Sequence, residues 1–367
     1  MQLKINFTMT GFNKTGGTIV LANIMNRLIE RGHKVSITSI KGRFDLVSPS
    51  VQHITAKGLN IKASWYCSRA LSAFFRRLLK HEIYINTYRD LDILESIMPE
   101  CDINVATYHL TAFPVFRSKK GVPFYHMQHY EVLFSTDPHR RALVEETYYL
   151  PLNKIANSVW LKNQLKDNHS IDCPVINPGI DHSIFKVRCD KNRKKKRVVT
   201  YGSNADWKGF KDALEAMKIV FKKYKNIEWI VFGLSPLKYW DDSAPYQFIQ
   251  GIYNENLAEL YSSAHVVICP SWFESFPLPP LEAMACGAPV VTTRYGTEDY
   301  CFHEENSLII PPKNPQLIAD AVLRLLTDED LNRKLSHRGI ETAKKFTWER
   351  TIDKLEDLYK KALSNKR

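Results

Sequence analysis

The sequence contains no apolar run long enough to cross a membrane and no two cysteines in a C-x-x-C pattern. Because a spanning helix needs about 18 or more apolar residues in a row, we expect no transmembrane helix. The seven cysteines are an odd number, which favours reduced thiols over a disulfide framework or a metal site. Residues 1–7 lack the apolar core of a secretory signal, so we expect a cytoplasmic protein.

Acidic residues are scarce relative to basic ones, with 39 Asp and Glu against 51 Lys and Arg, and the net charge is +12. Such an excess suits nucleic acid, an anionic membrane or a polyanionic small substrate. Much of it lies in residues 186–197, KVRCDKNRKKKR, which has the character of a solvated linker. No recognition motif of the usual kinds surrounds this run, so we expect no nucleic-acid partner.

The length of 367 residues exceeds what one hydrophobic core usually supports, so two domains are expected. Short apolar strands alternate with helical patterns in both halves, which predicts an α/β protein with parallel sheets. The predicted strands of the first half are residues 3–7, 35–40, 103–107, 123–128, 154–157 and 175–177, with a helix over 18–31. Those of the second half are 197–201, 227–232 and 266–269, with helices over 210–224, 317–326 and 330–345.

The most informative segment is PSWFESFPLPPLEAMACGAPVV, in which seven residues separate Glu274 from Glu282. It follows a predicted strand, and Pro280 predicts the start of a short helix over 281–286, with Glu282 in its first turn. Both carboxylates would then lie at the carboxyl end of a parallel strand, where α/β sheets bind ligands and helix N-termini attract phosphate. A ligand with phosphates and sugar hydroxyls would fit, whereas helix-flanking acids that complement the macrodipole are the alternative.

With Pro270, Ser271 and the small residues 283–287 in the same order, the segment resembles the signature of the retaining glycosyltransferases of family 4 (GT4). The resemblance implies the GT-B fold, in which two Rossmann-like, doubly wound domains face each other across a cleft. It implies an acceptor domain over residues 1–178 and a nucleotide-sugar domain over 179–346, with a C-terminal helix over 347–367 that joins the first domain. Pro277 stands where the family usually has glycine. Because proline has no backbone N–H, this position cannot donate a hydrogen bond to a ligand.

Two glycine-containing loops follow predicted strands. The loop over residues 10–18 nearly forms a P-loop, but Gly17 replaces the required lysine, which argues against an ATPase or kinase. Gly16 and Gly17 can still let a diphosphate or an acceptor approach the backbone, and GT4 enzymes carry such a pair here. In the second loop, over residues 202–209, Lys208 matches a lysine of the family, whereas Ser203 stands where the family usually has arginine. Backbone donors would therefore have to supply more of the stabilisation of the leaving diphosphate.

Three histidines lie in or after predicted strands. The resemblance places His129 near the transferred sugar, and His109 is expected on the acceptor side. His126 falls inside a strand and is expected in the core. No recognised metal-ligand spacing is present, so we expect no metal. The D-x-D pattern at Asp90 and Asp92 lies in a helical stretch and is better explained by helix-flanking acids.

The resemblance implies a retaining, metal-independent glycosyltransferase without a cofactor. It would move a hexose-type sugar from a nucleoside-diphosphate sugar to a glycan or lipid-linked acceptor in cell-surface polysaccharide or glycolipid synthesis. Glu282 would bind the ribose hydroxyls, and Glu274, His129 and Lys208 would be catalytic. The other implied donor-site residues are Gly16, Gly17, Ser203, Ile252, Ser275, Phe276 and Leu278. The alternatives are an epimerase or phosphorylase of the same fold, a basic nucleic-acid-binding protein, and a transferase-like subunit that only binds.

Residues 61–79 combine aromatic and basic residues at helical spacing. This pattern suits either a helix on an anionic membrane surface or an ordinary packed helix with solvated charges. Because many GT4 enzymes modify lipid-linked acceptors, peripheral attachment to the inner membrane face is a further hypothesis.

Overall fold

The computed structural model describes residues 1–12, 16–40, 42, 44–56, 67, 70, 85–188 and 195–365. The aromatic and basic segment 61–79 lies almost entirely outside these residues, and so does the centre of the basic run 186–197. The chain divides into two compact units. The first unit comprises Met1–Asn157, Lys162–Ile176 and Ile352–Arg367, and the second comprises Ser158–Leu161 and Asn177–Thr351.

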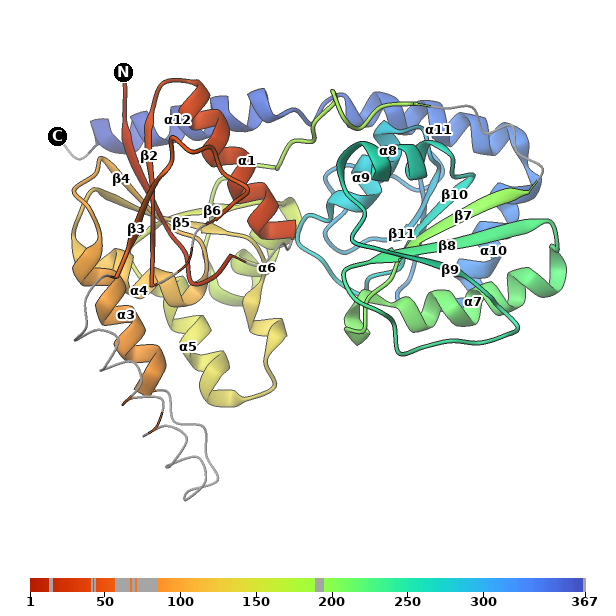
Figure 1. The fold of residues 1–367 in the computed structure, drawn as a ribbon, viewed down its shortest axis with the longest axis horizontal. Coiled ribbons are helices and arrows are strands. Elements are labelled where there is room, and N and C mark those ends of the chain that lie inside the picture. The colour runs from red at the N-terminus through yellow and green to blue at the C-terminus, as the bar shows by residue number, and fades with distance from the viewer. Residues whose placement is uncertain are drawn as a thin grey trace. The chain divides into compact units, whose positions relative to one another are not determined.

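The first unit is built on a parallel sheet with the strand order β3-β2-β1-β4-β5-β6 (Figure 1). Its elements are β1 (Lys4–Thr8), α1 (Gly16–Glu30), β2 (Lys34–Ser39), β3 (Gln52–Thr55), α3 (Ile85–Ile97), β4 (Ile103–Ala106), α4 (His109–Ser118), β5 (Val122–Met127), the 3-10 helix η1 (Glu131–Phe134), α5 (Pro138–Tyr149), β6 (Asn153–Ala156) and most of α6 (Val159–His169). The C-terminal helix α12 (Trp348–Ser364) returns to this unit from Ile352 onward. Its Tyr359 ring packs edge-on against Phe124 of β5 at 4.9 Å between centroids.

The predicted strand over residues 175–177 is wrong. Only a single bridge forms there, between Ala156 and Val175. Pro174 and Pro178 flank the segment, and proline has no N–H to donate to a strand ladder. The chain therefore leaves the first unit in an extended form without adding a seventh strand.

The second unit has a parallel sheet with the order β12-β11-β10-β7-β8-β9. Its elements are β7 (Lys196–Tyr201), the 3-10 helix η2 (Asp206–Lys208), α7 (Phe210–Lys223), β8 (Ile227–Gly233), β9 (Gln247–Gln250), α8 (Asn254–Ser262), β10 (Val266–Cys269), α9 (Leu278–Ala285), β11 (Val290–Thr293), β12 (Leu308–Ile310), α10 (Pro315–Thr327) and α11 (Glu329–Ala343).

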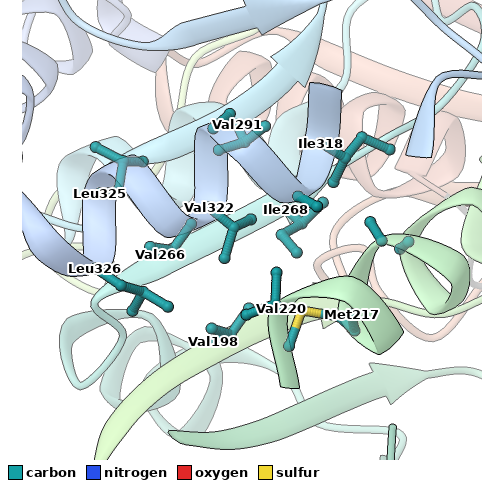
Figure 2. Close-up of a cluster of buried hydrophobic side chains, with 14 of the residues drawn as sticks. Val198, Met217, Val220, Val266, Ile268, Val291, Ile318, Val322, Leu325 and Leu326 are labelled. Atoms are coloured by element: carbon teal, nitrogen blue, oxygen red, sulfur yellow. The ribbon is translucent and has the colours of Figure 1, made fainter. Parts of the chain in front are cut away.

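Helices cover both faces of this second sheet. Figure 2 shows one face, where Val198 of β7 packs with Val220 of α7 and Val322 of α10. The next residue, Val199, belongs to the cluster on the opposite face, which includes side chains of α8 and α9. Because successive strand residues point to opposite faces and both faces are buried, the strands are apolar throughout. This explains why β10 was predicted with the bounds that it has.

The predicted α/β class, with doubly wound parallel sheets, is confirmed. In the first sheet the strand order reverses between β1 and β4, and in the second between β7 and β10. Ligands of open α/β sheets bind outside the carboxyl ends of the strands at such reversal points. Within the described part of the chain, no helix has both the length and the apolar content that crossing a bilayer requires.

Candidate functional site

Two predicted catalytic side chains meet at the reversal point of the second sheet. Lys208 ends η2, which follows β7, and Glu274 lies in the loop after β10. The Lys208 Nζ atom lies 2.5 Å from Glu274 Oε1, and the Ser271 hydroxyl donates to the same oxygen at 2.8 Å. The two side chains are only 22% and 13% exposed. An ion pair this sheltered interacts more strongly than one in bulk water.

Two stacked aromatic rings lie next to the lysine of this ion pair, and no sequence motif marks them. The Lys208 ammonium lies 4.3 Å from the centre of the Trp207 ring. Trp207 in turn stacks on Phe273, with centroids 5.3 Å apart and planes 11° apart. The sequence could have pointed to these rings only through their position, since Trp207 directly precedes Lys208 and Phe273 directly precedes Glu274. A cation held over an aromatic face is stabilised by the ring quadrupole, so Trp207 helps to orient the lysine.

The two loops that carry the ion pair are joined by direct contacts. The Trp272 N–H donates to the Trp207 carbonyl at 2.7 Å, and the Trp272 indole donates to Asp212 at 2.6 Å. Gly209 adopts a φ of +69°, and a Cβ atom there would lie 2.1 Å from the Pro270 carbonyl oxygen. This close approach requires glycine, because the loops could not pack together around a side chain.

The prediction for the start of the helix with Glu282 is wrong. Helix α9 begins at Leu278 rather than at residue 281, and no acidic residue lies in its first turn. Proline is tolerated in the first turn of a helix, where its missing N–H would have no partner, so both Pro279 and Pro280 fit there. As a result Glu282 lies in the second turn.

The Glu282 carboxyl group is desolvated even though the residue as a whole is half-buried. Burial raises its pKa to about 8. Its charge acts on Tyr261, Cys269 and Cys286, and after burial it contributes to the upward shifts of their pKa values. Among the described residues, no side chain forms a hydrogen bond with this carboxyl group. It is therefore an acid that a polar ligand could stabilise in its charged form.

This raised pKa predicts that stability falls with pH. Between the unfolded value near 4.5 and the folded value of about 8, unfolding releases a proton from Glu282, so each pH unit lowers the free energy of unfolding by up to about 1.4 kcal/mol. The Glu282→Gln variant should lose this slope and be more stable than the wild type at pH 8. Urea unfolding at pH 5, 6, 7 and 8 measures the effect. If the free energy of unfolding changed equally with pH in the two proteins, the predicted role of Glu282 would be contradicted.

The remaining predicted donor-site residues of the second unit differ in accessibility. Phe276 is 7% exposed and packs against Tyr300, and Ser275 is 2% exposed. The Ser203 hydroxyl accepts the Ala205 N–H at 3.2 Å and so shapes its own loop. Ile252 follows β9, and Leu278 opens α9. In the described structure, the side chains of Phe276 and Ser275 therefore face the protein interior, so a ligand would reach these two residues through their backbone.

A cavity of about 300 Å³ opens at the reversal point of the first sheet. Its described lining is Met9, Thr10, Gly11, Gly17, Thr18, Leu21, Thr107, Tyr108, Gln128, His129, Glu131 and Phe134. Gly17 and His129 were predicted, whereas Gly16 opens α1 outside this lining. The His129 ring packs on Phe134 with centroids 4.4 Å apart.

His109, which was predicted on the acceptor side, lies behind the described lining of this cavity. It is 3% exposed, and its ring contacts the carboxyl group of Glu131, which does line the cavity. His126 is 1% exposed, as expected for a core residue, and burial lowers its pKa to about 4. Glu131 could not be identified from the sequence, because no motif marks it.

The described residues contain no group of three or more His, Cys, Asp or Glu side chains that could hold a metal ion. Asp90 and Asp92 both lie in α3. Asp92 pairs with Arg117 at 2.8 Å, and Asp90 lies 3.4 Å from Arg89. These contacts agree with the interpretation of the D-x-D pattern as helical surface acids.

Residues 183–346 match the model of the family described as glycosyl transferases group 1. The chain is 26% identical over 271 residues to the O-antigen biosynthesis protein RfbC of Myxococcus xanthus, covering 71% of this chain and 21% of RfbC. Over 111 residues it is 39% identical to the D-inositol 3-phosphate glycosyltransferase of Saccharomonospora viridis, covering 30% of this chain and 26% of that enzyme. The matches thus span about a fifth to a quarter of these relatives.

The structure resembles that of Anabaena Alr3699/HepE, which was solved in complex with UDP-glucose. The TM-score is 0.73 and the sequence identity is 14%, over 98% of this chain and 100% of that chain. At this identity the likeness shows the fold alone, and the predicted GT-B class is confirmed.

Proposed function

Residues 183–346 form a domain of the glycosyl transferases group 1, and from this premise we propose that the chain is a retaining, metal-independent glycosyltransferase. It moves a hexose-type sugar from a nucleoside-diphosphate sugar to a glycan or lipid-linked acceptor in cell-surface polysaccharide or glycolipid synthesis. Residues 61–79 lie almost entirely outside the described structure, so a cytoplasmic location with peripheral attachment to the inner membrane face stays a prediction from sequence.

The observation that carries this proposal is the Lys208–Glu274 ion pair at the β7–β10 reversal point, inside the matched family region. A donor bound there can replace each partner of the pair with its own group. Its phosphate oxygens accept hydrogen bonds from the ammonium group, and its sugar hydroxyls donate to the carboxylate. Because the ligand brings both kinds of group, the ammonium group keeps an anionic partner and the carboxylate keeps hydrogen-bond donors.

In the proposed reaction the bond from the anomeric carbon to the phosphate oxygen breaks while the acceptor oxygen approaches the same face of the sugar. The departing phosphate oxygen takes the proton of the acceptor hydroxyl, so no separate base is required. Lys208 stabilises the negative charge that develops on the leaving diphosphate, and Glu274 stabilises the positive charge on the sugar ring. His129 is the proposed neighbour of the sugar from the first unit.

The proposed donor contacts beyond this pair come from the family resemblance. Glu282, with its raised pKa, can accept hydrogen bonds from the ribose hydroxyls once it is ionised. The segment after β9, which includes Ile252, is the proposed neighbour of the base. Gly16 and Gly17 at the start of α1 would approach the diphosphate through their backbone N–H groups.

UDP-glucose, the ligand of the fold neighbour HepE, is the first donor to test, within a panel of nucleotide sugars and methyl glycoside acceptors. We expect a glycoside product with the anomeric configuration of the donor, at an unchanged rate in excess EDTA. NMR of the product measures the configuration. An inverted product or a rate abolished by EDTA would contradict the mechanism. A free or phosphorylated sugar without an acceptor product would favour an epimerase or phosphorylase instead.

A further inference from the structure

The cavity of the first unit contains a carboxyl group that the proposed mechanism does not use. Glu131, the first residue of η1, is 4% exposed, yet it forms part of the cavity wall. Burying a carboxyl group is costly unless hydrogen bonds compensate for the loss of water. Its place in the wall therefore depends on the groups that hold it.

His109 holds one oxygen of this carboxyl group in two ways. The backbone N–H of His109 donates to Glu131 Oε2 at 3.0 Å, and the His109 Nδ1 atom contacts the same oxygen. His109 is the first residue of α4, where backbone N–H groups lack helical partners and the helix dipole favours a negative charge. The Glu131 N–H donates to the Tyr148 hydroxyl at 3.2 Å, which fixes the backbone as well.

These contacts leave the second carboxyl oxygen for a ligand. Oε1 of Glu131 forms no hydrogen bond with any described residue, and it is not among the fully buried atoms that lack a partner. Since Oε2 is occupied by His109, a ligand in the cavity would meet a fixed acceptor that needs no rearrangement. Such preorganisation lowers the cost of binding.

The rest of the described wall is suited to a sugar. Tyr108 and Phe134 offer aromatic surface for the apolar face of a pyranose ring, and Gln128 offers an amide for its hydroxyls. None of the described lining residues is a lysine or an arginine. The volume of about 300 Å³ lies at the lower end of the range for ligand pockets, which suits a single sugar unit.

The resemblance assigns the acceptor to the first unit, and we propose that Glu131 makes this cavity selective for a neutral acceptor sugar. Glu131 accepts a hydrogen bond from an acceptor hydroxyl, and His109 is the positioning residue that holds the carboxylate. A phosphate or carboxylate group on the acceptor would be repelled by the like charge of Glu131. This inference rests on the proposed function, because it assigns the cavity to the acceptor of that reaction.

The test measures glycoside binding to the full chain by saturation-transfer NMR. The probes are the methyl α-glycosides of glucose, mannose, galactose and rhamnose, with glucose 6-phosphate as the anionic competitor. We expect at least one neutral glycoside to bind in preference to the phosphate. The Glu131→Gln variant should bind it about 10- to 100-fold more weakly, the size expected for a lost hydrogen bond to a charged group, and its preference for neutral over anionic sugars should narrow.

Two further variants separate the role of His109 from a structural effect. His109→Gln should weaken binding several-fold in the wild-type background and have little further effect on Glu131→Gln, because both act through one carboxyl group. Leu133→Ala, an exposed position in η1 outside the lining, should bind as the wild type does. Should Glu131→Gln fail to fold, Glu131→Asp tests the same point, since it should keep the neutral preference at weaker affinity.

Absence of binding by all four glycosides, or equal binding by the wild type and Glu131→Gln, would overturn the subsite. Turnover of UDP-glucose and the other nucleotide sugars is measured on the same samples. Glycoside binding that depends on Glu131 in a chain without nucleotide-sugar turnover would support the subsite and contradict the proposed transferase. Turnover of a nucleotide sugar together with glycoside binding that Glu131→Gln leaves unchanged would support the proposed transferase and contradict the subsite.

Discussion

Replacing Lys208 with alanine is expected to lower kcat by about 10²–10³-fold, the effect of removing one electrostatic group aimed at charge that develops in a transition state. The loss of kcat should be large because Ser203 stands where the family usually has arginine, so no second cation at that position stabilises the leaving diphosphate. The substitution also leaves the largely buried Glu274 side chain without its ionic partner. Steady-state kinetics with the preferred nucleotide sugar measures the change, and we expect kcat to fall more than the KM of the donor rises.

The matched control is Lys211→Ala. Lys211 lies three residues further along, is 54% exposed, and pairs with Asp206 on the surface. This variant should keep the wild-type kcat, because exposed ion pairs contribute little. Glu274→Gln should lower kcat by a comparable factor, and the double variant should lose less than the product of the two effects, since the side chains act on each other. Wild-type turnover in Lys208→Ala would remove this lysine from the mechanism.

The sequence was sufficient to predict most of the central strands and the edge strand β6, but not the central strand β11. Residues 266–269 are apolar throughout because β10 is buried on both faces. The edge strands β3 and β12 were not predicted. β3 is only partly buried, and β12 has three residues, so neither gives a clear pattern. Helix α4 was not predicted either, because Pro114 lies inside it and proline usually ends a helix.

Some residues of the candidate site could likewise be identified from the sequence, whereas others could not. The resemblance identified Lys208 and Glu274, which the fold brings into contact across 66 residues of sequence. It did not identify Trp207 and Phe273, whose stacking depends on how two loops pack. Glu131 was equally out of reach, because its partner His109 lies 22 residues away on another element. Pairings of this kind depend on tertiary structure, and no local spacing encodes them.

Replacing Gly209 with alanine is expected to destabilise the second unit by roughly 2–5 kcal/mol, from left-handed strain of about 1–2 kcal/mol plus the cost of overpacking. The φ of +69° disfavours any side chain, and the new methyl group would lie 2.1 Å from the Pro270 carbonyl oxygen. The β7 and β10 loops must move apart to admit it, which separates Lys208 from Glu274. Activity should therefore fall with stability.

The control that isolates strain from collision is Gly32→Ala. Gly32 has a φ of +85°, but a Cβ atom there would meet nothing within 4 Å. This variant should lose only about 1–2 kcal/mol and keep full activity below its melting temperature. Urea unfolding and kinetics on both variants make the comparison. Equal losses of stability would mean that contact with Pro270 adds nothing, whereas a folded, active Gly209→Ala protein would show that the two loops can separate without disturbing the ion pair. The difference between the variants thus measures how far the close packing of these loops, rather than local backbone strain, keeps the lysine and the glutamate together.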